Sequence, residues 1–148
     1  MAERIPNGLL IKQMHDCLEK QANNSLRPKD LTMMQVSVLM YLQEAAGMQQ
    51  PMKEIERHFR VAQSTAAGII SRLEQKGLVE AIADADDKRV KLVHLTRAGE
   101  ACCAEAAGHM HEAEDLLTRG FSEAEKETLH ALLVRMAVNL READSARR

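Results

Sequence analysis

Residues 83–96 read ADADDKRVKLVHLT and bring charges of both signs into one short stretch of the chain. Asp87 and Arg89 lie two residues apart, so in an extended segment their side chains point to the same side and can form an ion pair. Asp84 and Asp86 are typical of turns, because an aspartate side chain forms hydrogen bonds with the nearby backbone and tolerates a tight turn. The stretch is therefore interpreted as a polar hairpin that presents Arg89, with Asp87 holding the arginine in place. The ordinary alternative is a solvated polar hairpin with no partner.

A second set of polar side chains lies in residues 63–77, which read QSTAAGIISRLEQKG. The apolar residues recur at helical spacing and form one face, which consists of Ala66, Ile69, Ile70 and Leu73. Gly77 is the residue at which we expect the helix to end. The opposite face carries small and polar residues, namely Gln63, Ser64, Thr65, Ala67, Gly68, Ser71, Arg72 and Gln75. Such a face can bond a polar partner; the alternative is a face that only contacts water.

Both polar sets need elements that position them, and hydrophobic spacing predicts a mostly helical chain. Thr32 with Gln35, and Ser122 with Glu125, have the spacing of capping boxes and mark the starts of two helices. Pro51 suits the first position of a short helix. In chain order we expect helices over about 9–23, 31–46, 51–59 and 63–76, strands over 78–83 and 90–95 with a loop over 84–88, and helices over 96–119 and from 122 onwards.

This order of elements predicts the fold class. Two helices joined by a short turn form a helix-turn-helix, and the hairpin that follows is a wing. We expect a mainly α chain: a winged helix-turn-helix with a three-helix core and a two-stranded β wing, flanked by long dimerisation helices. The expected divisions are an N-terminal helix in 1–30, the winged helix in 31–96 and C-terminal helices in 97–148. Apolar stripes on the first and last helices indicate a partner surface, most simply a second copy of the chain.

The composition limits the class of protein. The chain has 148 residues and a net charge of −2, and it contains no apolar run long enough to span a membrane. The N-terminus lacks the pattern of a secretion signal, so we expect a cytoplasmic protein with its three cysteines reduced. Residues 53–91 hold eight Lys and Arg against seven Asp and Glu, whereas residues 100–148 hold six against ten. A nucleic acid, if bound, would therefore meet the middle of the chain. No nucleophile–base set or phosphate loop appears, so neither an enzyme nor a cofactor is expected.

The segments VAQSTAAGIISRLEQKGLV and DADDKRVKLVHLTRAG resemble the winged-helix core of the MarR family of bacterial transcription regulators. The likeness runs in order from about Leu31 to Gly99, and the flanking helices match the family's dimerisation helices in position and length. The resemblance implies a homodimer that binds a pseudo-palindromic site in double-stranded DNA. It also implies a sequence-specific regulator, expected to be a repressor that a small aromatic or phenolic ligand releases. A winged-helix module that binds protein instead of DNA is the alternative class, and a purely structural helical dimer is a third.

On this reading the polar residues take separate roles at the DNA. Gln63 would pair with adenine in the major groove, and Ser64 and Thr65 would reach a base or a phosphate. Ala67 would touch a thymine methyl and Arg72 a phosphate. The resemblance places Arg89 in the minor groove, where narrow A·T tracts attract a guanidinium. The remaining phosphate contacts are expected from Lys53, Lys88 and Lys91.

Two positions in or next to the helix expected over 63–76 depart from the family pattern. Ala62 stands where a capping Ser or Thr is common, and Gly68 stands where a longer side chain that reaches the bases is common. Fewer side chains can then reach the bases. Sequence choice is therefore expected to depend on the wing and on DNA shape.

Other residues raise the question of sensing. Thioethers are adaptable, so an effector pocket is expected to involve Met14, His15, Met33, Met40 and Met110, with ordinary core packing as the alternative. Cys17 lies in the first helix, where some relatives carry a reactive cysteine, so a redox-sensing regulator is a further alternative. Cys102 and Cys103 are interpreted as structural thiols. The histidines form no coherent ligand set, so no metal site is expected.

Overall fold

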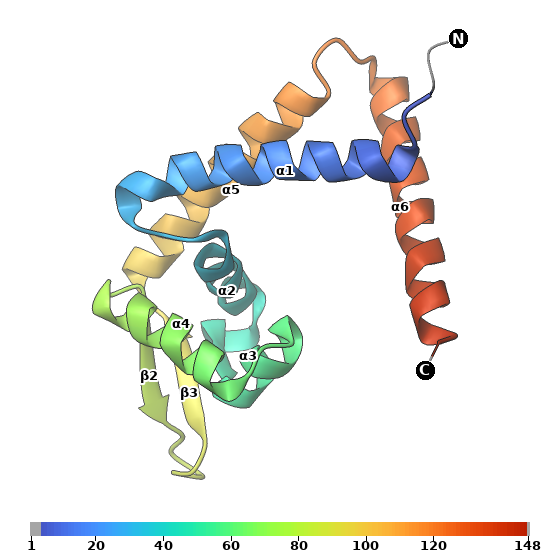
Figure 1. The fold of residues 1–148 in the computed structure, drawn as a ribbon. Coiled ribbons are helices and arrows are strands. Elements are labelled where there is room, and N and C mark those ends of the chain that lie inside the picture. Colours follow the sequence, from blue (N-terminus) through green and yellow to red (C-terminus); the bar gives the residue numbers. More distant parts are fainter. Residues whose placement is uncertain (1–3, 148) are drawn as a thin grey trace. The chain divides into compact units, whose positions relative to one another are not determined.

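The computed structural model describes residues 4–147, which form helices and one small antiparallel sheet (Figure 1). The elements are α1 (Asn7–Leu26), η1 (Arg27–Lys29), α2 (Met33–Glu44), η2 (Ala46–Met48), β1 (Gln49–Pro51), α3 (Met52–Phe59), α4 (Gln63–Gln75), β2 (Val79–Ala83), β3 (Lys91–Leu95), α5 (Arg97–Leu117) and α6 (Glu123–Ser145). The chain divides into two compact units, of which unit 1 ends at Met110 and unit 2 begins at His111. Within residues 4–147, no helix combines the length and the apolar character that crossing a membrane requires.

Both expected capping boxes are confirmed. Gln35 N donates to Thr32 Oγ1 at 3.2 Å, and Thr32 N donates to Gln35 Oε1 at 3.1 Å, so α2 begins where the pattern indicated. Ser122 and Glu125 form the same reciprocal pair at the start of α6, at 2.8 and 3.2 Å. Each box satisfies two backbone donors that a helix start otherwise leaves without a partner.

The core of unit 1 lies where α2, α3, α4 and the sheet meet. Its largest fully buried side chains are Leu39, Leu42, Ile55, Ile70 and Leu73, with Val38, Val79, Val93 and Cys103 completing the set. Burying one such Leu or Ile contributes roughly 1.5–3 kcal/mol, so this cluster holds the three helices and the sheet together. An aromatic group extends the contact between α2 and α3: the Tyr41 ring stacks on His58 with centroids 3.9 Å apart, and Phe59 meets both rings edge-on.

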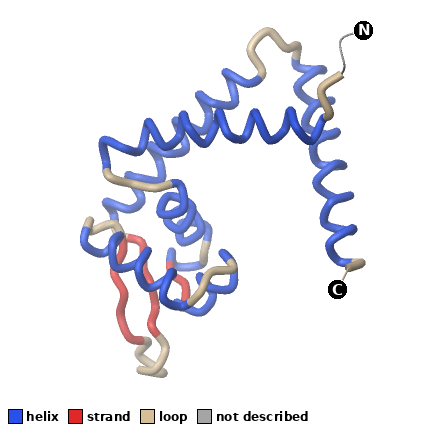
Figure 2. Tube along the Cα trace, viewed as in Figure 1, coloured by secondary structure: helices blue, strands red, loops and turns tan. Residues whose placement is uncertain are grey.

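The sheet has one strand more than the sequence predicted. β3 pairs antiparallel with β2 on one side and with β1 on the other, in the order β1-β3-β2. β1 escaped prediction because it is only three residues long and ends in Pro51, which residue types alone do not favour in a strand. Pro51 was expected as the first residue of this helix, but it is the N-cap, and α3 begins one residue later at Met52. The loop between β2 and β3 spans 84–90 rather than 84–88 (Figure 2).

Residues 95–99, which read LTRAG, attach the start of α5 to the end of α4. Thr96 Oγ1 donates to Gly77 O at 2.6 Å and accepts from Gly99 N at 3.1 Å, while Thr96 N donates to Leu78 O at 3.1 Å. Gly99 allows this approach, because a Cβ at that position would lie 2.3 Å from Leu78 O and 2.5 Å from a Leu95 methyl group. The motif that resembled the family therefore has a structural purpose: it fixes the first turn of α5 on the winged-helix unit.

The flanking helices carry apolar side chains that no core of the described chain covers. In α1, which is longer than expected at both ends, Leu9, Leu10, Ile11 and Met14 are exposed. Unit 2 holds the last turns of α5 and all of α6, and α6 contains no buried residue. Its exposed apolar residues include Leu132, Leu133, Val134, Val138 and Leu140. Exposed apolar side chains in such numbers fit the partner surface that the sequence led us to expect.

Candidate nucleic-acid interface

The candidate interface starts from a helix-turn-helix formed by α3 and α4. The helix α3 ends at Phe59, and Arg60 takes the left-handed conformation with φ 52°. Arg60 N then donates to Arg57 O at 3.3 Å, and Val61 N donates to Glu56 O at 3.1 Å. These bonds satisfy the last carbonyls of α3 and turn the chain into α4 within three residues. Arg60 is an exposed cation at this turn that the sequence did not single out, because no glycine or asparagine marks its left-handed backbone.

The two faces of α4 divide as its spacing predicted. Ala66, Ile69, Ile70 and Leu73 are all buried. The residues expected on the outward face are exposed at Gln63, Ser64, Thr65, Ala67 and Arg72, and Gly68 is half-buried. The sequence therefore identified which side chains of α4 a partner can reach.

The two residues that depart from the family pattern, Ala62 and Gly68, lie at the N-cap and in the middle of α4. Ala62 is its N-cap and provides no side-chain bond, so the first-turn N–H groups have no capping partner from that residue. At Gly68, no atom lies within 4 Å of the position that a Cβ would take. The missing side chain is therefore not excluded by packing, and the space beside this turn is open.

The wing, which comprises β2, β3 and the loop between them, presents Arg89 as expected. Arg89 N and Nε both donate to Asp87 Oδ1, at 3.1 and 3.3 Å, so one carboxylate oxygen holds the residue by its backbone and its side chain. The Arg89 side chain is nevertheless 92% exposed. Asp84 Oδ1 accepts from Asp86 N at 2.9 Å, which is the turn role that its residue type predicted. The contact between Asp87 and Arg89 is confirmed, and the role of that contact at DNA remains a prediction.

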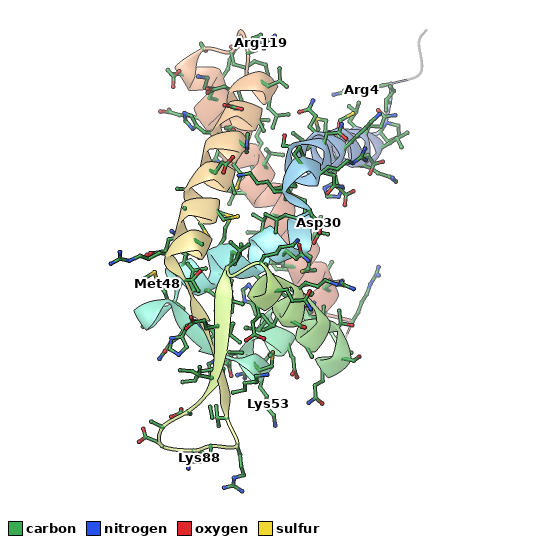
Figure 3. The ribbon with its side chains drawn as sticks, turned by 90° about the vertical axis from the view of Figure 1, so that its left-hand side faces the viewer. Arg4, Asp30, Met48, Lys53, Lys88 and Arg119 are labelled. Atoms are coloured by element: carbon green, nitrogen blue, oxygen red, sulfur yellow. The ribbon has the colours of Figure 1, made fainter. Side chains whose placement is uncertain are left out.

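Further cations lie on the same unit. Lys53, at the start of α3, and Lys88, in the wing loop, both extend from the lower end of the view in Figure 3. Lys53, Lys88 and Lys91 are exposed. Arg57 is also exposed and pairs with Glu54 on its own helix.

The C-terminal end of α4 is attached to the segment that precedes α2. Lys76 Nζ donates to the Asp30 carbonyl and lies 3.6 Å from Asp30 Oδ2. Lys29, the residue before Asp30, pairs with Glu105 of α5. The contact of Lys76 with Asp30 and that of Thr96 with Gly77 hold the C-terminal end of α4, whereas the polar N-terminal end of the helix stays exposed.

None of the residues expected in an effector pocket lines the small cavity found in unit 1, and their role stays a prediction. Met14, Met33 and Met110 are exposed, as is His15, and Met40 packs against the core. A small cavity in unit 1 has a volume of about 10 Å³, enough for roughly one water. It is lined by other residues, namely Ser25, Leu26, Lys29, Cys102, Glu105, Ala106 and His109.

The cysteines differ in exposure. Cys17 is exposed on α1, Cys102 is half-buried and Cys103 is buried. Burial, followed by the neighbouring Cys102 and Glu100, raises the pKa of the Cys103 thiol to about 11. Cys103 is therefore protonated at neutral pH, which fits its interpretation as a structural thiol.

Among residues 4–147, a group of potential metal ligands occurs on α1, where atoms of His15, Asp16 and Glu19 lie within 4.8 Å of one another. All three side chains are exposed, and Asp16 is engaged by Lys12 at 2.7 Å. His15 lies 3.9 Å from Glu19. The i,i+4 spacing of Lys12 with Asp16 and of His15 with Glu19 on one helix accounts for this grouping.

Comparison with known proteins agrees with the geometry. Residues 29–90 match the model of the MarR family. The chain is 34% identical over 134 residues to the multiple antibiotic resistance protein MarR of Salmonella typhimurium, covering 88% of this chain and 90% of that protein. It is 35% identical over 122 residues to the uncharacterized HTH-type transcriptional regulator YwoH of Bacillus subtilis, covering 82% and 87%. Among solved structures, a mutant of Escherichia coli MarR complexed with operator DNA superposes with a TM-score of 0.71 at 30% identity, covering 89% and 94%.

Proposed function

Because the chain belongs to the MarR family of transcriptional regulators, we propose that it binds an operator in double-stranded DNA as a homodimer and represses transcription there. Each protomer would place the outward face of α4 in a major groove and Arg89 of the wing in the neighbouring minor groove. Phosphates would be met by Lys53, Arg72, Lys88 and Lys91.

The observation that carries this proposal is that the outward face of α4 and Arg89 of the wing are both exposed to solvent in unit 1. The small polar residues of α4 are exposed on the face opposite its buried stripe. Beside them, Asp87 tethers an arginine that remains 92% exposed. A tethered but solvent-exposed guanidinium loses less conformational freedom on binding than a free one does, which suits a groove contact. The relative that was solved with operator DNA supports the same class of partner.

The proposed dimer covers the apolar side chains of the flanking helices. Leu9 and Leu10 of α1, and Leu132 and Leu133 of α6, are each between 39% and 48% exposed. A second copy offers the same residues and so forms a self-complementary contact. Its two α4 helices would then lie about 34–36 Å apart, which is one turn of the duplex.

We further propose that a small organic acid or phenol releases the DNA by changing the separation of the two α4 helices. The cavity in unit 1 holds roughly one water, so an aromatic ligand needs space elsewhere. The candidate lining from α1, α2 and α5 is Met14, His15, Met33, Met40 and Met110, and a second copy would complete the pocket. Titrating such compounds into the DNA complex is expected to raise the Kd, and no effect from any of them would contradict this extension.

Salt dependence tests the DNA-binding proposal and separates it from a protein-interaction module. A dimer that displaces counterions from phosphates is expected to lose affinity for genomic fragments steeply between about 50 and 200 mM salt. Arg119→Ala is a control, because Arg119 is an exposed arginine in the turn between α5 and α6 and lies outside both the candidate interface and the two helices. The control is expected to bind as the wild type does. An affinity that does not change with salt, or no affinity at low salt, would contradict the proposal.

A further inference from the structure

One strand of the sheet has an open edge beside α4. The order β1-β3-β2 leaves β2 paired on one side only. Thr96 N donates to Leu78 O, and Asp84 N donates to Val90 O. The backbone N–H and C=O groups of the even-numbered residues along β2 therefore point toward β3. Because hydrogen bonding alternates along an antiparallel strand, the N–H of Ala81 points away from β3 toward the open edge. That donor needs an acceptor from outside the sheet.

Glu74, in the last turn of α4, supplies the acceptor. Its Oε1 accepts from Ala81 N at 3.0 Å. The bond crosses the tight connection at Gly77, whose φ of 70° turns the chain from α4 into β2. This side chain thus joins the helix that carries the outward polar face directly to the strand that leads to the wing.

The charge of Glu74 is unexpected for a residue on this helix. It is an exposed carboxylate on the element proposed to enter the DNA groove, and an acid close to phosphates opposes binding by repulsion. Its bond to the edge of β2 provides a reason for its presence. Glu80 is a useful comparison, because it is an exposed acid on β2 itself and does not form this link.

We propose that Glu74 is a positioning residue for DNA recognition. By holding β2 at a fixed angle to α4, its carboxylate lets the outward face of α4 and Arg89 of the wing reach one duplex together. The inference rests on the proposed function, since only a DNA-bound protein uses both elements at once. Glu74 itself need not contact the DNA.

Three variants separate positioning from charge. Glu74→Ala removes both the acceptor and the charge, Glu74→Gln keeps an Oε1 acceptor without the charge, and Glu80→Ala removes a nearby acid that makes no such bond. Residue-resolved amide exchange of Ala81 in the free protein reports the bond. A hydrogen bond of ordinary net strength corresponds to roughly a threefold to tenfold change in an equilibrium. Exchange at Ala81 is expected to quicken about that much in Glu74→Ala and to change little in the other two variants.

DNA affinity at a fixed salt concentration shows how losing the bond from Ala81 to Glu74 changes binding. Glu74→Ala is expected to bind about threefold to tenfold more weakly than wild type, although repulsion alone would make it bind more tightly. Glu74→Gln and Glu80→Ala are expected to bind at least as tightly as wild type. In an Arg89→Ala background, Glu74→Ala is expected to have no weakening effect, because the wing contact that it positions is absent.

The failures of the two proposals are distinguishable. Unchanged exchange at Ala81 in Glu74→Ala, or binding by that variant as tight as by Glu74→Gln, would overturn the positioning role. Weakening that persists in the Arg89→Ala background would also overturn it, because it would be independent of the wing. A wild-type protein that binds no duplex would instead contradict the proposed function, and the exchange pattern would still decide whether Glu74 holds β2.

Discussion

Replacing Arg89 with Ala should separate DNA binding from folding more cleanly than any other single change in the chain. The side chain is 92% exposed, and the partner that holds it is Asp87, itself 48% exposed. An exposed ion pair of this kind contributes roughly 0–1 kcal/mol, so the free energy of unfolding is expected to change by no more than about that. The dimer should be unaffected, because the wing lies outside the apolar faces of α1 and α6.

Binding should change much more than stability. Losing one specific arginine contact with DNA removes roughly 1–3 kcal/mol, and the homodimer loses one in each half-site, so the complex is expected to be at least about fivefold to 150-fold weaker. The slope of log affinity against log salt concentration is expected to fall in magnitude by about two, because the homodimer loses one cation near the phosphate backbone in each protomer. Fluorescence anisotropy with a labelled duplex at several salt concentrations measures both quantities. Urea denaturation of the same preparations measures the stability.

Asp87→Ala provides the matched test of the tether. It leaves the Arg89 charge in place but frees the side chain, and immobilising a free side chain on binding costs roughly 0.5–1.5 kcal/mol. Loss of a nearby acid partly offsets this, so the variant is expected to bind at an affinity between those of wild type and Arg89→Ala. Arg89→Ala binding within twofold of wild type (about 0.4 kcal/mol) with an unchanged salt slope would refute the groove role of this residue.

Three further changes test the local structure. Ala62→Ser is expected to stabilise the protein by about 0.5–2 kcal/mol in urea denaturation, since α4 has no side-chain cap; an unchanged midpoint would contradict that. Gly99→Ala is expected to destabilise the protein by at least roughly 1–3 kcal/mol, because the new Cβ would lie 2.3 Å from Leu78 O. A neutral effect would contradict this expectation, since it would mean that the contact between α5 and Leu78 relaxes at no cost. With a thiol pKa of about 11, folded Cys103 keeps its proton at a pH where the unfolded thiol has lost it. The stabilisation that it provides is therefore present below about pH 9 and lost between about pH 9 and 11, so the stability difference from Cys103→Ala should shrink over that range.

Much of the candidate interface could be predicted from residue types and spacing. The 3.6-residue period placed Ala66 and Leu73 on the buried face of α4 and thereby identified its exposed side. The two-residue spacing of Asp87 and Arg89 indicated their contact, although the backbone there forms a turn and is not extended: Val90 N donates to Asp87 O at 2.9 Å, and Arg89 N donates to Asp87 Oδ1 at 3.1 Å. Short-range signals of this kind depend on local backbone geometry alone.

The features that escaped prediction depend on contacts between distant segments or on an unusual backbone. β1 becomes a strand because β3 offers it an edge, and no periodic pattern fits within three residues. Arg60 adopts φ 52° without the glycine that usually signals such a turn. The bond from Ala81 to Glu74 requires a particular angle between α4 and β2, which the sequence does not specify. The arrangement of two protomers on DNA likewise remains a prediction.

Selection of bound fragments from a random pool of duplexes tests the central claim most directly. A homodimer that reads DNA with two α4 helices and two wings should enrich an inverted repeat whose half-site centres lie about 10–10.5 base pairs apart. A·T-rich steps should flank each half-site, where Arg89 is expected to enter the minor groove. Enrichment of a single unrepeated half-site, or of no sequence at low salt, would contradict the claim that two copies of this chain bind one duplex together.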